Sequence, residues 1–186
     1  MKTLRGCTSA NDTRKCIVEV ATRVFALHGF QRAPLSLIAF EAGVSKSLIL
    51  WYFGSKDSLV LEVAKHVLPL DIVSGCLGQE DLGAQGLLEC IGSRYLRKYS
   101  SSLMASLLLQ TISLENTYTE IRMLLDKLCT GYVREIARRV FGEPLNKEKV
   151  AKIRIFMGSL LCYSLRPIES IDASKYLESL IKLIMH

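Results

Sequence analysis

The residues with the clearest capacity for chemistry stand in one short run, KSLILWYF, at positions 46–53. Lys46 and Ser47 open the run, and a lysine ammonium or a serine hydroxyl can bind guanine acceptors or phosphate oxygens. Trp51 and Tyr52 add an indole N–H and a phenol O–H that can donate to phosphate. The rest of the run is apolar, and a protein in water does not expose such a run without cause.

Three structures fit the apolar part of this run: a buried strand, a membrane-contacting foot or a helix. Against a strand, the run lies between helical segments without a partner strand, and a lone strand is unstable. A membrane foot needs greater apolar length or a stronger basic flank than Lys46 and Lys56 supply. A helix would place Ile49 and Phe53 on an inner face. Its outer face would then carry Ser47, Leu48 and Trp51, flanked by Leu50 and Tyr52.

The helix is preceded by a second short helical segment, in the arrangement of a helix-turn-helix motif. Residues 34–42 and 45–53 form the two predicted helices, and Gly43 lies in the tight turn between them. In such a motif the second helix enters the DNA major groove, and its N-terminal amides attract phosphate. Apolar residues also recur at helical spacing in 13–30 and 55–69. The first part of the chain is therefore predicted to form four short helices.

The remaining sequence predicts a helical body. Four of the twelve glycines fall in residues 70–86, which we interpret as a hinge between head and body. Further helices are expected at about 84–100, 102–114, 117–141, 146–165 and 173–185. Side chains suited to capping mark the helix starts: Ser45, Ser55, Asn146, Asp172 and either Asn11 or Thr13. Because no alternating strand pattern and no repeat is present, the predicted fold class is all-α.

The net charge is +6, and the N-terminal third holds most of it. Residues 1–70 contain nine Lys and Arg against five Asp and Glu, which suits a polyanionic partner. The longest uncharged stretch, residues 99–114, is shorter than the roughly 20 apolar residues that a membrane span needs. The N-terminus has no apolar secretory core. We therefore expect a cytoplasmic protein without a membrane partner.

Six cysteines stand at positions 7, 16, 76, 90, 129 and 162, and none forms a CxxC pair. Their apolar neighbours favour small core residues in a reducing compartment, with a redox-sensing thiol as the alternative. With three histidines in the chain, no metal site and no cofactor is expected. HExxH, GxSxG, P-loop and GxGxxG motifs are absent, which argues against an enzyme.

The segments TRKCIVEVATRVFALHGF and IAFEAGVSKSLILWYFGSKDSL together resemble the TetR family of one-component transcriptional repressors. The resemblance covers residues 13–61 and lies in the order of its pieces, from a first helix ending in Gly-Phe to the lysine that opens the fourth helix. It implies a DNA-binding domain of three or four helices at 10–70, with its helix-turn-helix motif at about 34–53. It also implies a helical ligand-binding and dimerisation domain at 71–186.

The resemblance implies roles for the residues of the reading helix. Lys46 and Ser47 occupy positions that reach base edges. Trp51 and Tyr52 occupy positions that pack on sugar and phosphate. Lys56 occupies the position of a clamp on the DNA backbone.

Three positions depart from the family's pattern. Ala33 stands where a Thr or Ser commonly caps the second helix, Leu48 where Thr is common, and Leu50 where a phosphate-binding Tyr is common. Each change removes a polar contact worth on the order of 1 kcal/mol. Either DNA binding is weaker than usual in the family, or Leu48 and Leu50 contact thymine methyl groups. Both leucines are included in the predicted DNA-binding set.

The resemblance also implies a homodimer, in which the last two helices of each subunit form the interface. The sequence supports this independently, because these helices have more apolar surface than one core needs. The predicted interface residues are Phe156, Leu160, Leu161, Leu177, Leu180, Ile181 and Ile184. Tyr176 and Leu183 give the last helix a second apolar side.

The family's body usually encloses a pocket for a small molecule, whose binding changes the spacing of the two heads. The candidate lining residues, each of which has ordinary core packing as its alternative, are Cys90, Tyr95, Met104, Leu108, Met123, Tyr132, Phe156 and Cys162. Since few charges interrupt these helices, we expect an apolar or amphipathic ligand such as a lipid, an acyl chain or an aromatic drug. Arg94, Arg97 and Lys98 either meet an anionic head group of the ligand or form a solvated face.

The prediction for the whole chain is a ligand-responsive, dimeric DNA-binding regulator. Its expected action is that of a repressor that leaves a palindromic double-stranded DNA operator when the ligand binds. The alternative is a helical small-molecule-binding protein of the same fold that no longer reads DNA. The departures at Ala33, Leu48 and Leu50 favour this alternative.

Overall fold

In the computed structural model, which describes residue 7 and residues 10–186, every regular element is a helix. This confirms the prediction of an all-α fold for the described residues. The N-terminal helices, called the head, are α1 (Ala10–His28), α2 (Leu35–Ala42), α3 (Lys46–Phe53) and α4 (Lys56–Val67). The helices that follow, called the body, are α5 (Leu70–Leu77), α6 (Ala84–Lys98), α7 (Ser102–Ser113), η1 (Leu114–Asn116), α8 (Thr119–Asp126), η2 (Lys127–Tyr132), α9 (Val133–Phe141), α10 (Lys147–Leu165) and α11 (Ala173–Met185).

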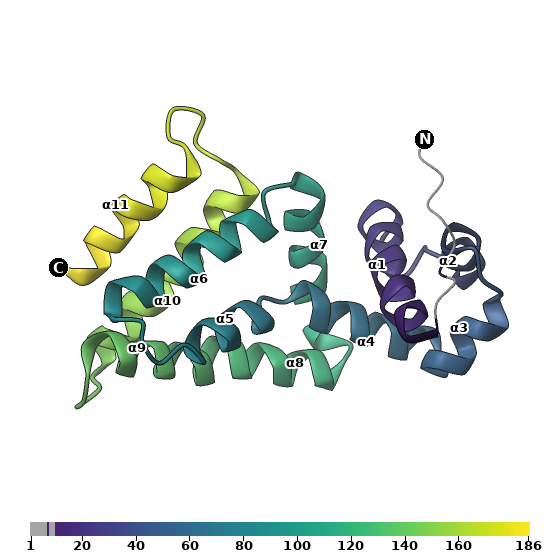
Figure 1. Cartoon of the computed structure of the whole chain (residues 1–186), viewed down its shortest axis with the longest axis horizontal. Helices are drawn as coiled ribbons and strands as arrows, with labels where there is room; N and C mark the ends of the chain where they lie inside the picture. The colour runs from purple at the N-terminus through teal and green to yellow at the C-terminus, as the bar shows by residue number, and fades with distance from the viewer. Residues whose placement is uncertain (1–6, 8–9) are drawn as a thin grey trace.

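The head is a small helical unit built around one apolar core. α1 packs against α2 and α4, and α3 lies at the end of the molecule opposite to α11 (Figure 1). Side chains buried at the centre of the head include Ile17, Phe25, Ile38, Ile49 and Leu59. Because such residues recur at helical spacing, burying them fixes how each helix is rotated about its axis.

The turn between α2 and α3 has the geometry predicted for a helix-turn-helix motif. Gly43 ends α2 in the left-handed region, with φ +65°, where a residue without Cβ is favoured. The backbone N–H groups of Gly43 and Val44 donate to the carbonyl oxygens of Phe40 and Ala39, 3.2 and 3.0 Å away. The chain thereby changes direction, so that α2 and α3 are bent by 105° relative to each other.

Side-chain caps confirm four of the predicted helix starts. The Oγ of Ser45 accepts the backbone N–H three residues later at 3.1 Å, and the Oγ of Ser55 does the same at 3.0 Å. Asn146 and Asp172 cap α10 and α11 in the body. These four helices therefore begin where local hydrogen bonding favours a start.

The start of α1 differs from the prediction. This helix already begins at Ala10, so positions 11 and 13 lie inside it and not before its first turn. The hydroxyl of Thr13 donates to the carbonyl oxygen of Cys7 at 3.3 Å. The backbone N–H of Cys7 donates to the carbonyl oxygen of Ala42 at 3.2 Å. Cys7 is thereby fixed between the first turns of α1 and the end of α2.

Residues 70–86 contain a helix, which corrects the prediction of a glycine-rich hinge. α5 occupies Leu70–Leu77 and buries three of its side chains, Ile72, Val73 and Cys76. Burying an aliphatic side chain contributes about 1.5–3 kcal/mol, whereas a glycine inside a helix costs about 1 kcal/mol. The apolar spacing of α5 therefore outweighs its glycine at position 75. Residues 78–83 form the irregular link to α6.

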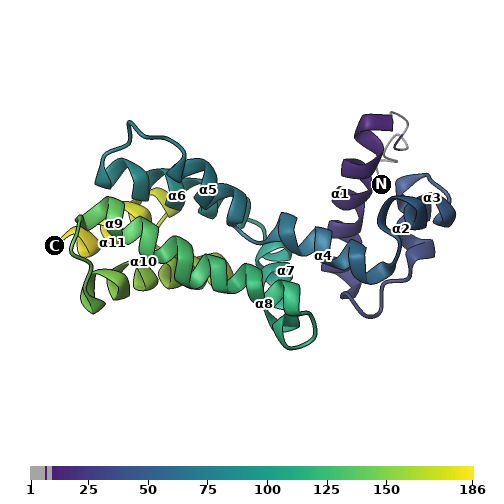
Figure 2. The same ribbon diagram turned by 90° about the horizontal axis from the view of Figure 1, so that it is seen from below.

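α4 joins the head to the body, as Figures 1 and 2 show. It packs against α7 and α8, and α1 also packs against α7. Leu68 and Pro69 then lead directly into α5. A side-chain hydrogen bond strengthens this junction, because the hydroxyl of Tyr118 at the start of α8 donates to the Oδ1 of Asp57 on α4 at 2.9 Å.

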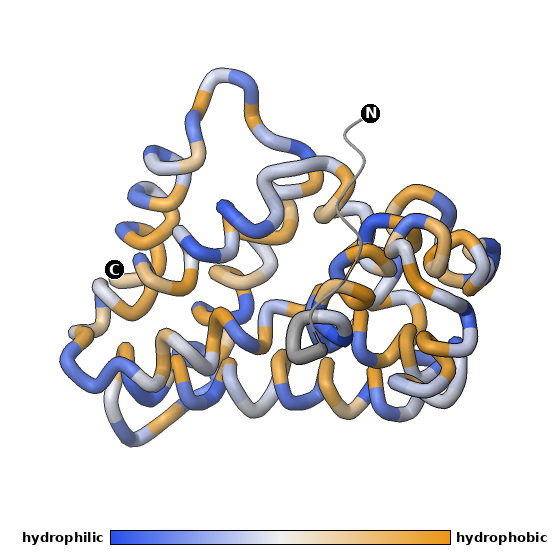
Figure 3. Tube along the Cα trace, turned by 45° about the vertical axis from the view of Figure 1, so that its right-hand side comes forward, coloured by the Kyte–Doolittle hydropathy of each residue, from blue (hydrophilic) through white to orange (hydrophobic). Residues whose placement is uncertain are grey.

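The body consists of helices packed around α6 and α10. α8, η2 and α9 follow one another without a break and form the long helix predicted at 117–141, with a π-helical segment in its middle (Figure 2). α11 packs on α6 and α10. α11 approaches α6 so closely that a Cβ on Gly92 of α6 would lie 2.2 Å from the Cδ1 of Leu177 on α11. Apolar and polar residues alternate along the helices, as the tube in Figure 3 shows, which is expected when one face of each helix packs inward.

Among the helices of the described residues, none is by itself long and apolar enough to cross a membrane. α2 and α3, which are bent relative to each other, are long and apolar enough for a membrane span only when their lengths are added together. Both helices contribute side chains to the head core, among them Ile38, Ala39 and Ile49.

Candidate nucleic-acid interface and body cavity

The two faces of α3 differ as the helical interpretation of KSLILWYF predicts. Ile49 and Phe53 are buried in the head core. Lys46 and Ser47 are exposed in the first turn of the helix. Helix N-termini favour anions, because their first backbone N–H groups have no partner within the helix. The exposed end of α3 thus combines a cation, a hydroxyl and backbone donors, all suited to phosphate or base acceptors.

Trp51 is the most exposed aromatic residue of α3, at 76%. Its ring meets the ring of Tyr52 edge-on, with centroids 4.8 Å apart. The half-buried Tyr52 in turn lies 6.2 Å from the ring of Phe53. A chain of aromatic contacts therefore connects the exposed indole with the core, which restricts the orientation of both polar tips.

Lys56, the predicted clamp on the DNA backbone, is half-buried and already makes one contact within the protein. Its Nζ donates to the carbonyl oxygen of Gln31, in the turn between α1 and α2, at 2.8 Å. An ammonium group has three donors, so further donors remain for a phosphate. The contact with Gln31 holds the charge close to the start of α4.

The three positions that depart from the family pattern lie in different environments. Ala33 is fully buried, and α2 begins after Pro34 without any side-chain cap. Leu48 is half-buried, whereas Leu50 is 37% exposed. The polar contact that a Ser or Thr would add at position 33 is therefore missing, while Leu50 presents apolar surface beside the exposed face of α3.

Arg14 is a functional candidate that the sequence reasoning missed. Its guanidinium lies over the ring of Phe53 at 5.0 Å and pairs with the Oε2 of Glu62 at 2.8 Å. Burial alone would raise the pKa of Glu62, but hydrogen bonds from Lys65 and Arg14 lower it below its usual value. This arginine on α1 thus holds α3 and α4 together. The role of Arg14 could not be predicted from the sequence, because its partners Phe53 and Glu62 are distant from it along the chain.

The body contains a cavity of about 400 Å³ between α6, α7, α8, η2 and α10. Two of the predicted lining residues, Tyr95 and Leu108, do line it. Leu68 and Pro69, at the junction of α4 and α5, form part of its wall. An occupant of this cavity would therefore touch the segment that connects head and body.

The other predicted lining residues lie elsewhere. Phe156 is fully buried core, Met123 is 66% exposed, and Cys162 is exposed. Met104 and Tyr132 are half-buried and lie outside the cavity wall. Cys90 lines a second depression, a groove of about 1110 Å³ between α6 and α11. Helical spacing places a residue on a face of its helix, but which faces enclose a cavity depends on how several helices meet.

The charged groups at the cavity also differ from the prediction. Arg154 on α10 lines it together with Glu115, Asp126 and the free thiol of Cys129. Burial raises the pKa of the Cys129 thiol, while the charge of Arg154 acts in the opposite direction. Arg154 is thus the cation that an anionic head group could meet, although two carboxylates stand beside it.

Arg94, Arg97 and Lys98, which were expected either to meet such a head group or to form a solvated face, lie outside the cavity wall. The Nζ of Lys98 donates to the Oδ1 of Asp71 at 2.9 Å and to the carbonyl oxygen of Leu68 at 3.4 Å. Arg97 lines the groove between α6 and α11. Arg94 lies beside Gly75 of α5, with its Nη1 3.5 Å from where a Cβ of this glycine would be.

Most residues predicted for the dimer interface are already buried within one subunit. This is the case for Phe156, Leu160, Leu177, Leu180, Ile181 and Ile184. Leu161 is half-buried and lines the cavity. The apolar side chains that α10 and α11 still expose are Ile155 at 55%, Leu183 at 70% and Met185 at 38%. A partner could bury these, whereas the predicted residues belong to the subunit's own core.

The cysteines correct the prediction of six small core thiols. Cys7 is bonded to Cys16, and Cys76 is bonded to Cys90. The remaining cysteines, Cys129 and Cys162, are free and exposed. The bonded pairs are nine and fourteen residues apart in sequence, so no short motif predicts them.

A short helix with an exposed N-terminus follows a tight glycine turn, which is the arrangement of a helix-turn-helix motif, and a helical body with a cavity is attached to it. Residues 17–63 match the family model described as bacterial regulatory proteins, tetR family. Residues 17–63 are therefore a helix-turn-helix domain of the TetR family of transcriptional regulators. The family is not enzymatic, in agreement with the absence of catalytic motifs.

Three known proteins illustrate the relationship. The HTH-type transcriptional regulator BetI from Agrobacterium fabrum is 46% identical over 55 residues, which are 30% of this chain and 27% of BetI. The chain thus aligns with about a quarter of BetI's length. SrpR from Pseudomonas putida, also an HTH-type transcriptional regulator, is 26% identical over 163 residues, covering 80% of this chain and 72% of SrpR. The structure of the transcriptional regulator FadR from Bacillus subtilis in complex with stearoyl-CoA matches with a TM-score of 0.68 at 17% identity, over 92% of this chain and 97% of that chain.

Proposed function

We propose that this protein is a dimeric repressor that binds a near-palindromic DNA operator and leaves it when a small amphipathic ligand enters the body cavity. The observation that carries the proposal is the exposed face of α3. It presents Lys46, Ser47 and Trp51 to the outside, while Ile49 and Phe53 fasten the helix to the head core. The working division of the chain would be a DNA-binding domain at 10–70 and a ligand-binding and dimerisation domain at 71–186.

The α3 helix of each subunit would enter a major groove with its N-terminus leading. Lys46 and Ser47 would then reach base edges, since they stand in the first turn. Trp51 and Tyr52, one turn later, would donate to sugar and phosphate. Lys56, held near the start of α4 by Gln31, would bind a phosphate with its remaining donors.

Dimerisation would use the apolar residues that one subunit leaves exposed on α10 and α11, above all Ile155 and Leu183. A two-fold dimer presents two copies of α3, which suits half-sites about 34–36 Å apart on one face of DNA. Ile155→Glu with Leu183→Glu should yield a folded monomer, because both side chains are exposed. Sedimentation velocity of this variant and of the unchanged protein tests the interface.

The ligand would be an acyl chain or another amphipathic molecule with an anionic head. The cavity offers apolar walls such as Leu108, Leu125 and Leu161, and Arg154 is its cation. FadR, whose fold is similar, is described in complex with stearoyl-CoA. Thermal-shift measurements with fatty acids and their coenzyme A thioesters of increasing chain length test this assignment, with sugar phosphates as polar controls. Stabilisation by the polar controls alone would contradict it.

The ligand can act on the head at both ends of α4. It would contact Leu68 and Pro69 directly, where α4 ends. It would also contact Leu125 on α8, whose first turn is joined to Asp57 by the hydroxyl of Tyr118. A displacement of either wall would rotate α4 and so change the spacing of the two α3 helices.

Selection of duplexes from a random DNA pool tests the proposed function. We expect enrichment of a near-palindrome whose affinity falls steeply with salt, as phosphate contacts release counterions. The alternative, a ligand-binding protein that no longer reads DNA, predicts ligand stabilisation without retention of any duplex at low salt. The two outcomes exclude each other, so one experiment separates them. We propose that the protein acts in the cytoplasm, where it would meet both the DNA and the ligand.

The enriched operator would also show what Leu48 and Leu50 do. We propose that Leu50, which is 37% exposed, contacts a thymine methyl group. Replacing single thymines of the operator by uracil, which lacks this methyl group, should weaken binding at one position in each half-site. Leu50→Ala should remove that difference between thymine and uracil. A uniform response at all thymines would contradict the assignment.

A further inference from the structure

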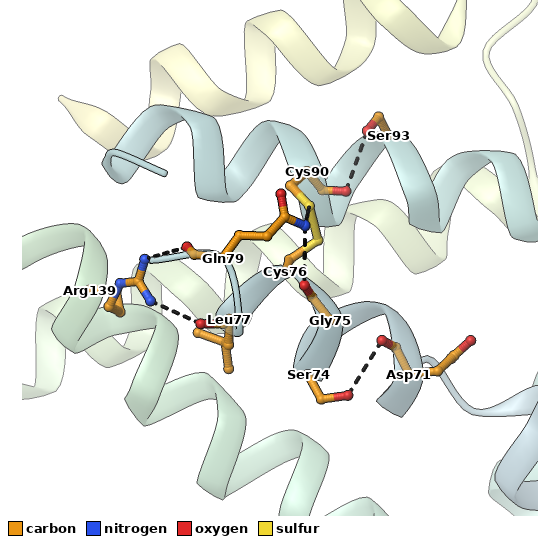
Figure 4. The surroundings of a disulfide bond; sticks show 9 residues. All are labelled: Asp71, Ser74, Gly75, Cys76, Leu77, Gln79, Cys90, Ser93 and Arg139. Carbon is orange, nitrogen blue, oxygen red and sulfur yellow. Dashed lines mark hydrogen bonds between the residues drawn. A yellow bond between two sulfur atoms is a disulfide. The ribbon is translucent and has the colours of Figure 1, made fainter. Parts of the chain in front are cut away.

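The disulfide between Cys76 and Cys90 joins α5, the first helix after the head, to α6 at the end of α5 that is remote from α4. Figure 4 shows that the bond lies between the last turn of α5 and the middle of α6. α5 is the direct continuation of α4 beyond Leu68 and Pro69. α6 in turn packs against α11. The bond therefore connects the helix that follows the head with the part of the body that carries the proposed dimer surface.

The two sulfur atoms would stay close if the bond were broken, because other contacts hold the same segments. Arg139 on α9 donates to the carbonyl oxygens of Leu77 and Gln79, at 3.0 and 3.1 Å, which fixes the link after α5 (Figure 4). At the other end of α5, Lys98 pairs with Asp71 at 2.9 Å. Two thiols held in this way can form a bond again without a search through the unfolded chain.

The two cysteines differ in access. Cys76 is fully buried, whereas Cys90 is half-buried and lines the groove between α6 and α11. The groove of about 1110 Å³ is large enough to admit a small molecule beside the Cys90 sulfur. The amide of Gln79 lies next to this sulfur, with its Nε2 3.8 Å from the Cys90 Sγ. Exchange with an external disulfide would therefore begin at Cys90 and be completed by Cys76.

We propose that Cys76 and Cys90 form a reversible thiol pair that reacts with low-molecular-weight disulfides such as oxidised glutathione, and that their bond sets how firmly α4 and α5 are held to α6. The Cys90 thiolate attacks one sulfur of the small disulfide, whose S–S bond breaks and releases one thiol. The Cys76 thiolate then attacks the Cys90 sulfur, and the second small thiol leaves. Two electrons and two protons thus pass from the cysteines to the small disulfide, which becomes two thiols.

The consequence for the head follows from the position of the bond. With the bond formed, α5 is fixed to α6 at both of its ends, and α4 has little freedom at the junction. With the bond reduced, the end of α5 is held without a covalent link, by hydrogen bonds such as those of Arg139 and by apolar packing. DNA binding, which rests on the proposed function, should be tighter in the oxidised form, because a head with fewer orientations loses less freedom on binding.

The test uses the full chain with Cys7, Cys16, Cys129 and Cys162 replaced by Ser, so that one pair remains. The protein is equilibrated in buffers with defined ratios of reduced to oxidised glutathione, and free thiols are trapped and counted by intact mass. Hydrogen exchange of α5 and the affinity for the selected operator are measured at the two extremes. Cys90→Ser in the same background is the control, with Cys76→Ala as a second variant in case one of them folds poorly.

We expect both thiols to disappear together as oxidised glutathione rises, with slower exchange of α5 and binding about threefold tighter or more in the oxidised form. The control variants should show neither difference. Thiols that stay free at every ratio in the folded protein would overturn the inference, and so would equal exchange of α5 in both forms. If the oxidised and reduced forms bound the operator equally, or if the reduced form bound it more tightly, the expected effect of the bond on DNA binding would be wrong. Absence of DNA binding in both forms would refute the proposed function, while thiol counts and exchange would still decide on the pair.

Discussion

α3 in the head and α11 in the body are both short amphipathic helices, yet they use their surfaces differently. α3 buries Ile49 and Phe53 and leaves Trp51 76% exposed, together with Lys46 and Ser47. α11 buries four apolar side chains in its own subunit, Leu177, Leu180, Ile181 and Ile184. The head thus keeps polar and aromatic groups of α3 on its surface, whereas α11 uses its buried apolar residues for the core of the body.

The two regions also differ in what determines their structure. The head depends on local features: Ser45 and Ser55 cap two helices, and Gly43 permits the turn. The body depends on contacts between distant segments, such as Gly92 with Leu177 and the Cys76–Cys90 bond. We infer that head and body can be altered separately, and the following predictions test that separation.

The largest effect is expected from Ile49→Ala, which removes a fully buried side chain of the head core. It should lower the free energy of unfolding by about 2–5 kcal/mol and abolish operator binding. Leu50→Ala, at the next and partly exposed position, should change stability by about 0.5 kcal/mol or less. Denaturant unfolding measures both. If Ile49→Ala also abolished ligand binding by the body, the proposed separation would be wrong.

Gly92→Ala makes the corresponding change in the body. The new Cβ would lie 2.2 Å from the Cδ1 of Leu177, so the Leu177 side chain or α11 itself must shift, at a cost of about 1–3 kcal/mol. Gly86→Ala in the same helix places its Cβ 3.5 Å from the Cδ2 of Leu82, an ordinary contact, and should stabilise by up to about 1 kcal/mol. Thermal unfolding distinguishes the two. The base preference of the head should be the same in both variants, and a changed preference in Gly92→Ala would argue against separate regions.

Changes at Ser47 on the exposed face of α3 and at Lys56, the first residue of α4, should alter DNA binding in different ways. Ser47→Ala should cost about 1–3 kcal/mol at particular bases and change which sequence is preferred. Lys56→Gln should weaken all sequences alike and lower the salt slope by about 1. Lys182→Gln, which removes an exposed lysine of α11, is the matched control. Anisotropy titrations at several salt concentrations give these values, and equal effects of Lys56→Gln and Lys182→Gln would contradict the assignment.

The smallest effect is expected at the contact between the regions. Tyr118→Phe removes the hydrogen bond to Asp57 and should reduce the coupling between ligand and operator by about 1 kcal/mol. Tyr163→Phe, which removes a hydroxyl that donates to Ile171 within the body, should leave the coupling unchanged. The coupling is obtained from operator affinity with and without a saturating fatty acid. Loss of coupling in both variants would show that the hydroxyl of Tyr118 has no particular role.

The same contact has a pH dependence. Partial burial and the hydrogen bond to Asp57 raise the pKa of Tyr118 to about 12. The unfolded chain therefore releases this proton at lower pH than the folded protein, so the stability contributed by the contact is complete below about pH 10 and is lost as pH rises towards 12. Unfolding midpoints in this range should fall less steeply for Tyr118→Phe than for the unchanged protein.

The sequence predicted the head in more detail than the body for a physical reason. Caps, a glycine turn and the spacing of Ile49 and Phe53 are properties of neighbouring residues, so a linear pattern contains them. The cavity wall brings together Leu68, Leu108 and Arg154 from three separate segments, and no local pattern contains that arrangement.

The errors follow the same rule. The glycines of 70–86 predicted a hinge, but packing of α5 against α6 outweighed their cost. The paired cysteines went unrecognised because the partners are joined through space. Six of the predicted dimer residues are already buried within one subunit, because a core and an interface require the same apolar stripe. An exposed residue such as Leu183 distinguishes them only once the subunit's own core is known.

The central claim, that the exposed face of α3 reads DNA, is tested most directly by comparing the affinity for the selected operator with that for a scrambled duplex of equal length and composition. We expect the operator to bind about a thousandfold or more tightly at physiological salt. We also expect Ser47→Ala to reduce this ratio while leaving the affinity for the scrambled duplex unchanged. Equal affinities for the two duplexes, at any salt concentration, would contradict the claim.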